Sequence, residues 1–176
     1  MVTRQAWIPG CGTYSVESMS DVYNPTVGQI FFHTSQPKDL AGPDTQEEKQ
    51  GTLINPTEEV ASKSSLQWYL NIASLANLAS VEQSDDSSAN PGEWRAKGAP
   101  TEVAIEVFAG RFGWNRFNLS QGEKAEWKHV AEYPFDSDVK KMTVLFHHIQ
   151  SDKTHIFTKV SSLPLESPSL DLFFRV

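Results

Sequence analysis

Apolar residues recur along the chain at three different spacings, which predict three different kinds of segment. The first fifty residues are interrupted by many prolines and glycines and contain one strand-like run, Gln29–His33, so we expect loops around a short strand. After Asn55 the apolar residues recur at the spacing of a helix. From Trp127 onwards they alternate with polar residues, as in strands that bury one face.

The helical segment carries clear signals at its start. Asn55 is a residue type that caps helices, Pro56 suits the first helical position, and Glu58 falls in the first turn. The apolar residues that follow form one wide stripe, made of Leu66, Tyr69, Leu70, Ala73 and Ala76 and widened by Ile72, Leu75 and Leu78. The sequence therefore predicts a helix that is buried over much of its circumference.

A second helix is predicted to begin at Pro100 and to stop at Gly113, with Glu102 in its first turn. One face of this helix is apolar and consists of Ala104, Val107, Phe108 and Phe112. The segment 81–92 between the two helices is rich in acidic, serine and turn residues, which predicts a solvated surface loop.

The last part of the chain is predicted to form three consecutive strands. In the first, Trp127–Phe135, the alternation places Trp127, His129, Ala131, Tyr133 and Phe135 on one face, and Pro134 predicts a sheet edge or a strand end. Turns at Asp136–Val139 and Ser151–Asp152 then lead into strands at Lys140–Ile149 and Lys153–Lys159. This meander and the two helices favour an α+β fold, mostly antiparallel sheet flanked by helices, over a doubly wound parallel sheet.

Composition and charge narrow the classes of function. The length of 176 residues fits one domain. Hydrophobic residues make up 39% of the chain and aromatic residues 11%, which is enough to build a core and excludes disorder for most of the chain. The net charge of -7 argues against a nucleic-acid or anionic-membrane surface, so we expect no nucleic-acid partner. Cys11 is the single cysteine, which favours a reducing compartment. No apolar run approaches the roughly 20 residues of a spanning helix, so we expect no direct membrane insertion by this chain.

The five histidines make a metal site the first chemistry to consider, but their spacing argues against one. His147 and His148 are adjacent, so on a strand they face opposite sides and cannot chelate one ion together. His129 and His155 belong to other predicted strands. We therefore expect no metal site.

Four other residues have the chemistry of a nucleotide site if they line one cleft. Glu102 begins a helix, Phe135 ends a strand, Lys140 begins the next strand and Lys159 ends the third. An aromatic ring can stack on a base, a carboxylate can accept a hydrogen bond from an exocyclic amine, and lysines neutralise phosphates. Structural roles explain the same residues: core packing for Phe135, a solvated strand edge for Lys140, and favourable charge at a helix start for Glu102. Residue spacing alone leaves both interpretations open.

The order of the motifs resembles that of P-type ATPase nucleotide-binding domains. Lys97–Ile105 is similar to the family's Gly-(Asp/Glu)-(Pro/Ala)-Thr-Glu-x-Ala-Leu segment, and Glu132–Val144 to its Phe-(Ser/Asp)-(Ser/Arg)-x-x-Lys-x-Met-(Ser/Thr)-Val strand pair. His155–Lys159 then lies where the family has the strand that leads into Lys-Gly-Ala-Pro-Glu. Lys97–Pro100 also resembles that last motif, but it precedes the phenylalanine strand and so does not correspond to it.

Within this family the chain looks most like the fungal ENA-type sodium/potassium efflux pumps, in the segments Arg4–Pro9, Val103–Ala109 and Tyr133–Ser137. The start of the chain resembles the sequence that closely follows the phosphorylated aspartate. The resemblance therefore implies that residues 1–12 are a hinge segment from the phosphorylation domain. It further implies that residues 13–159 are the nucleotide-binding domain, incomplete at its C-terminal end, and that residues 160–176 are an atypical tail.

The resemblance also implies a function and a set of ATP-binding residues. Phe135 would stack on adenine, Glu102 would contact the adenine edge, Lys140 and Lys159 would help to hold the purine and phosphates, and Thr101 and Met142 would complete the set. The chain would present ATP for phosphorylation of an aspartate outside it, so none of its own residues would be catalytic. Mg²⁺ would be held mainly by the phosphorylation domain of the parent pump. That domain and the actuator domain would be the partners of this one, in the cytoplasmic part of a plasma-membrane protein.

Two departures from the family pattern keep an alternative open. Ala99 stands where the family usually has an acidic residue. After Lys159 the expected Gly-Ala-Pro/Val-Glu is replaced by a different sequence, Val160–Pro168. The alternative is a non-catalytic interaction domain, or a degraded fragment that retains the fold without binding nucleotide.

The parent would be an ion-transporting ATPase, yet the isolated chain is expected to show no ion-stimulated ATP hydrolysis. The reason is that the resemblance places both the phosphorylated aspartate and the membrane helices outside this sequence. Phosphate release from the purified chain, measured with ATP and Mg²⁺ in the presence of Na⁺ or K⁺, tests this expectation. Robust turnover would contradict it.

Overall fold

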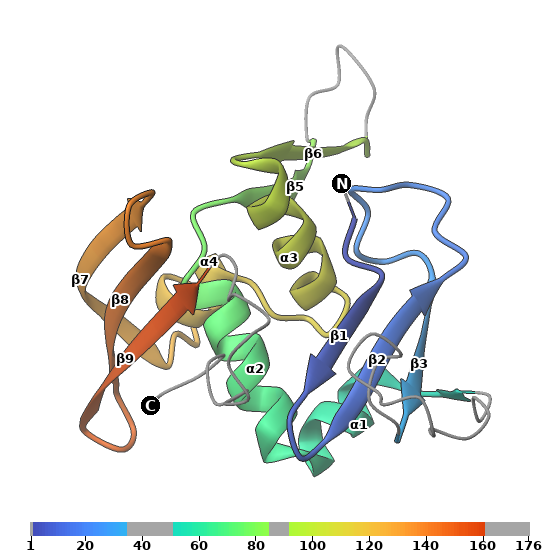
Figure 1. Ribbon diagram of the computed structural model, residues 1–176, viewed down its shortest axis with the longest axis horizontal. Helices are drawn as coiled ribbons and strands as arrows, with labels where there is room; N and C mark the ends of the chain where they lie inside the picture. Colours follow the sequence, from blue (N-terminus) through green and yellow to red (C-terminus); the bar gives the residue numbers. More distant parts are fainter. Residues whose placement is uncertain (1, 35–50, 85–91, 161–176) are drawn as a thin grey trace. The chain divides into compact units, whose positions relative to one another are not determined.

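The computed structural model describes residues 2–34, 51–84 and 92–160, which fall into two compact units (Figure 1). The first unit consists of Met1–Leu70 and Leu78–Gly113, and the second of Asn71–Asn77 and Trp114–Val176. Antiparallel sheets combined with helices confirm the predicted α+β class. Within the described residues, no helix is both long enough and apolar enough to cross a membrane.

The first unit contains a four-stranded antiparallel sheet in the order β1-β2-β3-β4. The strands are β1 (Gln5–Ile8), β2 (Gly12–Glu17), β3 (Gln29–His33) and β4 (Thr52–Leu53). The predicted strand is confirmed as β3, but the interpretation of residues 5–17 as loop is wrong, because the glycines there form the turn between two strands. Gly12 has a φ of +143°, and a Cβ on it would lie 2.5 Å from the carbonyl oxygen of His33, so only glycine lets the strands approach.

The predicted helix after Asn55 is in fact two helices, α1 (Pro56–Ser62) and α2 (Ser64–Leu75). The start is confirmed, since Asn55 Oδ1 accepts a hydrogen bond from the Thr57 amide at 3.1 Å. The break falls at Lys63, whose φ of -129° and ψ of 100° are extended. Serines flank this position on both sides, and serine side chains compete with the helix for backbone hydrogen bonds.

A buried polar contact ties α1 to β2. Tyr14 is fully buried, and its Oη donates to Glu59 Oε1 at 2.9 Å. Glu59 also pairs with Lys63 at 2.6 Å, and the Lys63 ammonium lies 3.3 Å from the ring centroid of Phe32. Burial is the largest cause that raises the pKa of Tyr14, so the phenol remains a neutral hydrogen-bond donor.

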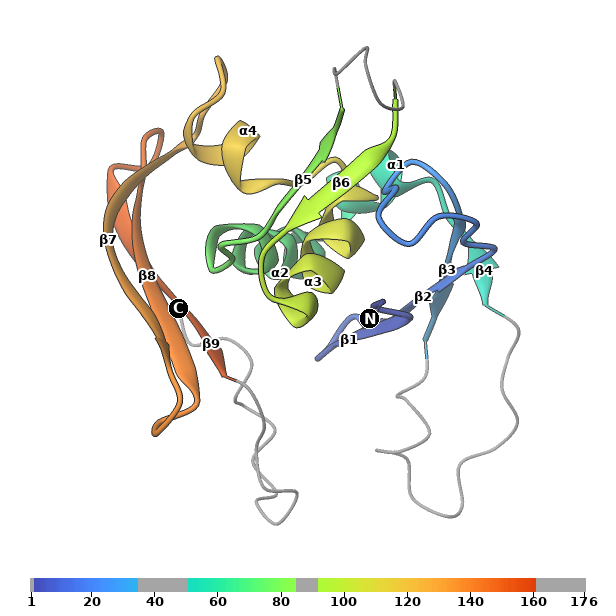
Figure 2. The same cartoon turned by 90° about the horizontal axis from the view of Figure 1, so that it is seen from above.

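The predicted second helix is confirmed as α3 (Pro100–Gly110). Its Val103 and Val107 pack with Ala79 and with the hairpin of β5 (Ser80–Gln83) and β6 (Trp94–Lys97), which Figures 1 and 2 show beside the helix. The prediction of a loop at 81–92 is therefore wrong at its start, where β5 runs. Residues 85–91 of that segment lie outside the described residues.

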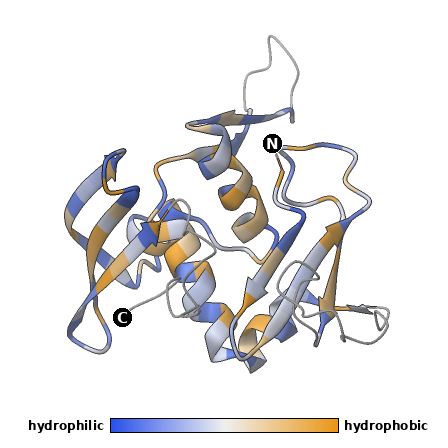
Figure 3. Ribbon diagram, viewed as in Figure 1, coloured by the Kyte–Doolittle hydropathy of each residue, from blue (hydrophilic) through white to orange (hydrophobic). Residues whose placement is uncertain are grey.

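The second unit confirms the predicted meander, with β7 (Trp127–Asp136), β8 (Lys141–His148) and β9 (Lys153–Val160) in that order. A short helix that the sequence did not predict, α4 (Arg116–Ser120), precedes the sheet. Polar and apolar residues alternate along the strands (Figure 3). One core joins residues of α2 to the sheet and consists of Ile72, Leu75, Ala76, Trp127, Met142, Val144, Phe146 and Phe157. Burying each large side chain stabilises the fold by about 1.5–3 kcal/mol.

The pairing of β7 with β8 is irregular at two places, and this overturns one prediction. The register changes between His129 and Ala131 and again between Tyr133 and Asp136. Because each irregularity reverses the alternation, Trp127 is buried while Tyr133 is exposed, and the five residues predicted to share one face do not. The prediction from Pro134 is confirmed, since β7 is an outer strand of this sheet.

Arg116 fastens α4 to the sheet of the second unit. Its Nη2 lies 2.8 Å from Glu132 Oε2 on β7, and its Nη1 donates to the carbonyl oxygen of Asn77 at 2.9 Å. The guanidinium also lies 5.6 Å from the ring centroid of Phe146. Both charged side chains of the pair are about four-fifths buried, with 21% and 22% of their surface exposed. The pair is therefore shielded from solvent and should contribute more than a surface ion pair.

Replacing Arg116 by alanine is expected to lower the free energy of unfolding by about 2 kcal/mol, because it leaves the largely buried Glu132 without this cation. Urea denaturation followed by circular dichroism measures the change. The matched control is Arg95→Ala, since Arg95 is 52% exposed and lies 3.8 Å from Glu93. It should cost less than about 0.5 kcal/mol. Equal losses in the two variants would contradict this assignment.

Candidate functional site

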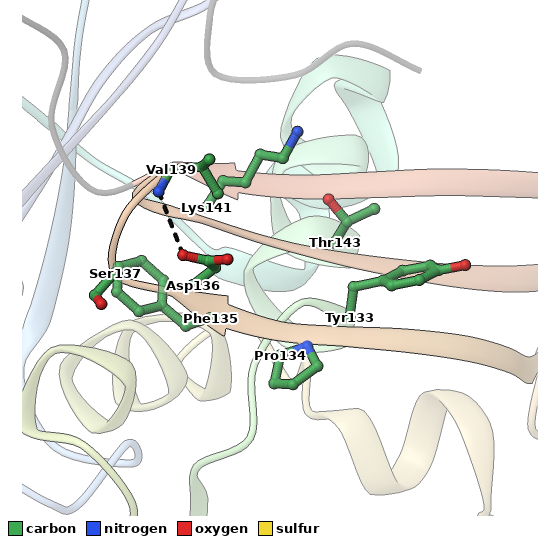
Figure 4. Close-up of a pocket in the computed structure, with 8 residues that line it drawn as sticks. All are labelled: Tyr133, Pro134, Phe135, Asp136, Ser137, Val139, Lys141 and Thr143. Carbon is green, nitrogen blue, oxygen red and sulfur yellow. Dashed lines mark hydrogen bonds between the residues drawn. The ribbon is translucent and has the colours of Figure 1, made fainter.

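A pocket of about 730 Å³ lies where β7 turns into β8 (Figure 4). Aromatic, apolar, hydroxyl and charged side chains line it: Tyr133, Pro134, Phe135, Asp136, Ser137, Val139, Lys141 and Thr143. All of these residues come from one hairpin of the second unit. The geometry of the pocket is thus set by the turn between β7 and β8 and by the register of these two strands.

Asp136 organises the turn. Its Oδ1 accepts hydrogen bonds from the amides of Asp138 at 2.8 Å and Val139 at 3.4 Å, the second of which is drawn in Figure 4. An aspartate that bonds the backbone ahead of it in this way is a common means of initiating a turn. Asp136 also pairs with Lys141, so the turn closes on these two residues.

Lys140 belongs to this turn rather than to the start of the strand, where the sequence placed it. Its φ is 54°, in the left-handed region. The next hairpin holds Asp152 at the same φ of 54°, but aspartate tolerates this conformation better than lysine does. Holding Lys140 there costs on the order of 1 kcal/mol, and such outliers gather at functional sites.

Phe135, Met142 and Lys159 lie in one row across the sheet. Met142 pairs directly with Lys159. Because Tyr133 pairs with Thr143 and Asp136 with Lys141, the bulge sets both Pro134 and Phe135 opposite Met142. Met142 is 1% exposed and belongs to the core, whereas Phe135 is 46% exposed. The row therefore has a buried centre and an accessible aromatic ring beside it.

Four of the six predicted ATP-binding residues thus gather at one end of the β7-β8-β9 sheet: Phe135, Lys140, Met142 and Lys159. The other two belong to the first unit, in the first turn of α3, where Thr101 is exposed and Glu102 is half-buried. Glu102 carries negative charge at the positive end of the helix dipole. Ala99 occupies the N-cap position and makes no side-chain capping hydrogen bond.

Of the eight described residues that line the pocket, Phe135 alone belongs to the predicted ATP-binding set, and the other seven, among them Tyr133, Lys141 and Thr143, were missed from the sequence. The predicted residues Lys140, Met142 and Lys159 are not among the described residues that line it. Successive residues of a strand point to opposite faces, so Lys141 and Thr143 lie on the face opposite to Met142. Tyr133 pairs with Thr143 and is 62% exposed. The bulge at Pro134–Phe135 was the only signal that could have separated Tyr133 from Phe135, and a sequence pattern of period two does not contain it.

Four of the five histidines lie on the β7-β8-β9 sheet, and the fifth, His33, lies on β3 of the first unit. The ring of His148 lies 4.6 Å from that of Trp127, while His147 Nε2 lies 3.3 Å from Asp152 Oδ1, so the adjacent histidines have different neighbours, as their opposite faces require. Burial, then the charges of His148 and Lys153, lower the pKa of His155. Among the described residues, no group of three or more His, Cys, Asp or Glu could hold a metal ion.

Comparison with known proteins gives the chain a family. The model of the family described as "P-type ATPase, cytoplasmic domain N" matches residues 65–161, more than half of the chain. The sodium/potassium exporting P-type ATPase cta3 of Schizosaccharomyces pombe is 34% identical over 154 residues, which cover 88% of this chain and 13% of that protein. The sodium/potassium exporting P-type ATPase 1 of Saccharomyces cerevisiae is 31% identical over 187 residues, covering 90% of this chain and 17% of that protein.

A more distant relative, the calcium-transporting ATPase of Bacillus subtilis, is 29% identical over 120 residues, which cover 68% of this chain and 12% of that protein. The chain therefore spans less than a fifth of the length of these relatives. The resemblance drawn from the motifs at Lys97–Ile105 and Glu132–Val144 is confirmed, including its likeness to fungal sodium/potassium exporters. This chain belongs to the P-type ATPase cytoplasmic domain N family.

Proposed function

We propose that this chain holds ATP and presents its γ-phosphate to an aspartate in another part of a sodium/potassium-exporting pump. The observation that carries the proposal is the row of Phe135, Met142 and Lys159 beside the Lys140 turn. It combines an accessible aromatic ring with two lysines at one end of a sheet. This is the chemistry that an adenine base and a chain of phosphates require.

In this proposal each residue has a separate role. Phe135 stacks on adenine, since close to half of its surface is exposed. Met142 supports the site from the core, and Lys140 and Lys159 hold the purine and the phosphates. Glu102 of α3 is assigned the contact with the adenine edge, and Thr101 belongs to the same set of ATP-binding residues.

The chemistry of the pump would be in-line transfer of the γ-phosphoryl group, in which positioning matters more than covalent help. Asp136 is the one carboxylate among the described residues that line the pocket, and its Oδ1 accepts two turn amides. We therefore assign Mg²⁺ mainly to the phosphorylation domain of the parent, which together with the actuator domain is the proposed partner. The parent would be integral to the plasma membrane and this domain cytoplasmic. Residues 1–12 would be the hinge and residues 160–176, of which 161–176 lie outside the described residues, an atypical tail.

Replacing Phe135 by alanine is expected to weaken ATP binding at least tenfold. One stacked base and a few hydrogen bonds in an open pocket predict a dissociation constant on the order of 0.1–1 mM for the unaltered chain. A titration of the labelled chain with ATP, followed by NMR chemical shifts, measures both values.

The matched control is Phe117→Ala, since Phe117 is an exposed aromatic residue of α4 that is not among the described residues lining the pocket. ATP affinity should stay within about twofold of the unaltered chain, because the stacking ring is retained. Loss of binding in Phe117→Ala with binding kept in Phe135→Ala would contradict a stacking role for Phe135. Absence of saturable binding up to about 10 mM ATP would favour the interaction-domain alternative.

The substitution Lys140→Asn should distinguish the role of this residue in the turn from its proposed contact with phosphate. Asparagine tolerates a positive φ, so the free energy of unfolding should stay the same or rise by about 0.5–1 kcal/mol. ATP affinity should fall several-fold while adenosine affinity stays unchanged, because adenosine carries no phosphate. Calorimetric titrations with both ligands and thermal denaturation test this, with Lys128→Asn as the control, since Lys128 is exposed and is not among the described residues lining the pocket. An equal loss of adenosine binding would contradict a phosphate role for Lys140.

A further inference from the structure

The pocket at the β7–β8 turn contains a cation that the motif resemblance does not assign (Figure 4). Lys141 is the one lysine or arginine among the described residues that line this pocket, and Phe135 lines the same pocket. Lys140 and Lys159, the two lysines of the predicted ATP-binding set, are not among those lining residues. The cation that shares the pocket with the proposed stacking ring is therefore Lys141.

The strand register directs Lys141 to the pocket side of the sheet. Lys141 begins β8, and Thr143, which also lines the pocket, follows it by two positions. Residues two apart on a strand share a face, so both side chains lie on the face opposite to Met142, which is buried in the core. Tyr133 pairs with Thr143 and also lines the pocket. Backbone pairing thus holds three pocket residues in position.

The ammonium group of Lys141 is accessible to a ligand. The residue is exposed, and within the described part of the chain no hydrogen bond or ion pair engages its side chain. In Figure 4 this side chain extends away from the carboxylate of Asp136, the residue that pairs with Lys141 across the turn. The Oδ1 atom of Asp136 instead accepts the amides of Asp138 and Val139. The ammonium can therefore offer its N–H donors to an anion.

Hydroxyl groups line the same pocket. The Oγ1 atom of Thr143 lies 3.1 Å from Oγ1 of Thr158 on β9, so this hydroxyl has a neighbour that orients it. Tyr133 is 62% exposed, and no hydrogen bond to another described residue uses its hydroxyl. Ser137 adds a third hydroxyl to the lining. Because phosphate oxygens accept hydrogen bonds from ammonium and hydroxyl groups alike, the pocket offers a phosphate several donors beside an aromatic ring.

We propose that Lys141 binds a phosphate group of ATP in this pocket, with the hydroxyl of Tyr133 as a second donor. The inference rests on the proposed function, in which the adenine stacks on Phe135. A nucleotide held by that ring needs a cation in the same pocket for its phosphates, and lysine serves this purpose as a point charge. A nucleoside gains nothing from the ammonium, so the pocket selects nucleotides over nucleosides.

The substitution Lys141→Gln removes the charge and tests this assignment. ATP affinity should fall about fivefold, the loss expected for one charged contact at an exposed site, while adenosine affinity stays unchanged. Lys128→Gln is the matched control, since Lys128 is exposed and is not among the described residues that line the pocket. NMR titrations of the full chain with ATP and with adenosine measure both affinities in each variant.

The substitution Tyr133→Phe checks the second donor, because it removes the hydroxyl and keeps the ring. ATP affinity should fall about two- to threefold, as for the loss of one hydrogen bond, with no change for adenosine. An unchanged ATP affinity would remove Tyr133 from the assignment.

The outcomes separate this inference from the function on which it rests. Equal ATP affinities in Lys141→Gln and Lys128→Gln would overturn the inference, and so would an equal loss of ATP and adenosine affinity in Lys141→Gln. If Phe135→Ala weakens ATP binding while Lys141→Gln does not, the proposed function stands and the role of Lys141 is excluded. Absence of saturable ATP binding by the unaltered chain would overturn both.

Discussion

The register between β7 and β8 is the constraint on which the candidate nucleotide site depends. Between Tyr133 and Asp136 the first strand has one residue more than the second, and this extra residue sets Phe135 opposite Met142. A regular ladder would have no extra residue before the turn. The bulge therefore decides how Phe135 enters the turn, where it lines the pocket together with Tyr133. The turn that follows it decides where Lys140 is held.

The core of the second unit holds this register in place. Met142, Val144 and Phe146 alternate along β8 and are each almost fully buried. A slip of one residue would expose all three and would cost several kcal/mol at about 1.5–3 kcal/mol for each side chain. Arg116 adds a second constraint on β7 through Glu132, two positions after the first irregularity. The outer strand β7 is thus held in place both by its pairing with the buried strand β8 and by the shielded ion pair between Arg116 and Glu132.

The sequence predicted correctly the helices and strands that are determined by residues close together in the chain. The Asn55 cap, the helix start at Pro100 and the three strands of the meander all have such signals, and all are confirmed. The errors arise where distant contacts decide. The segment 5–17 was interpreted as loop because β2 is held in the sheet by β3, which lies later in the chain. At the helix break, the Lys63 ammonium lies over the ring of Phe32 on β3, a contact that no local pattern contains. The bulges are set by the partner strand, so the pattern of β7 alone assigned its faces wrongly.

The same physical features explain why the proposed ATP site can be accessible and weak without weakening the fold. Phe135 and Lys140 lie outside the core, so exposing the ring and straining the turn remove no buried contact from the sheet. Met142 alone belongs to both the row and the core, and it links the position of the ring to the stability of the unit. The proposed function, which is to present a nucleotide to a separate aspartate, fits a domain with such an arrangement. Its affinity comes from a few exposed contacts, about 4–5.5 kcal/mol in all for a millimolar to submillimolar ligand, while its geometry comes from the core.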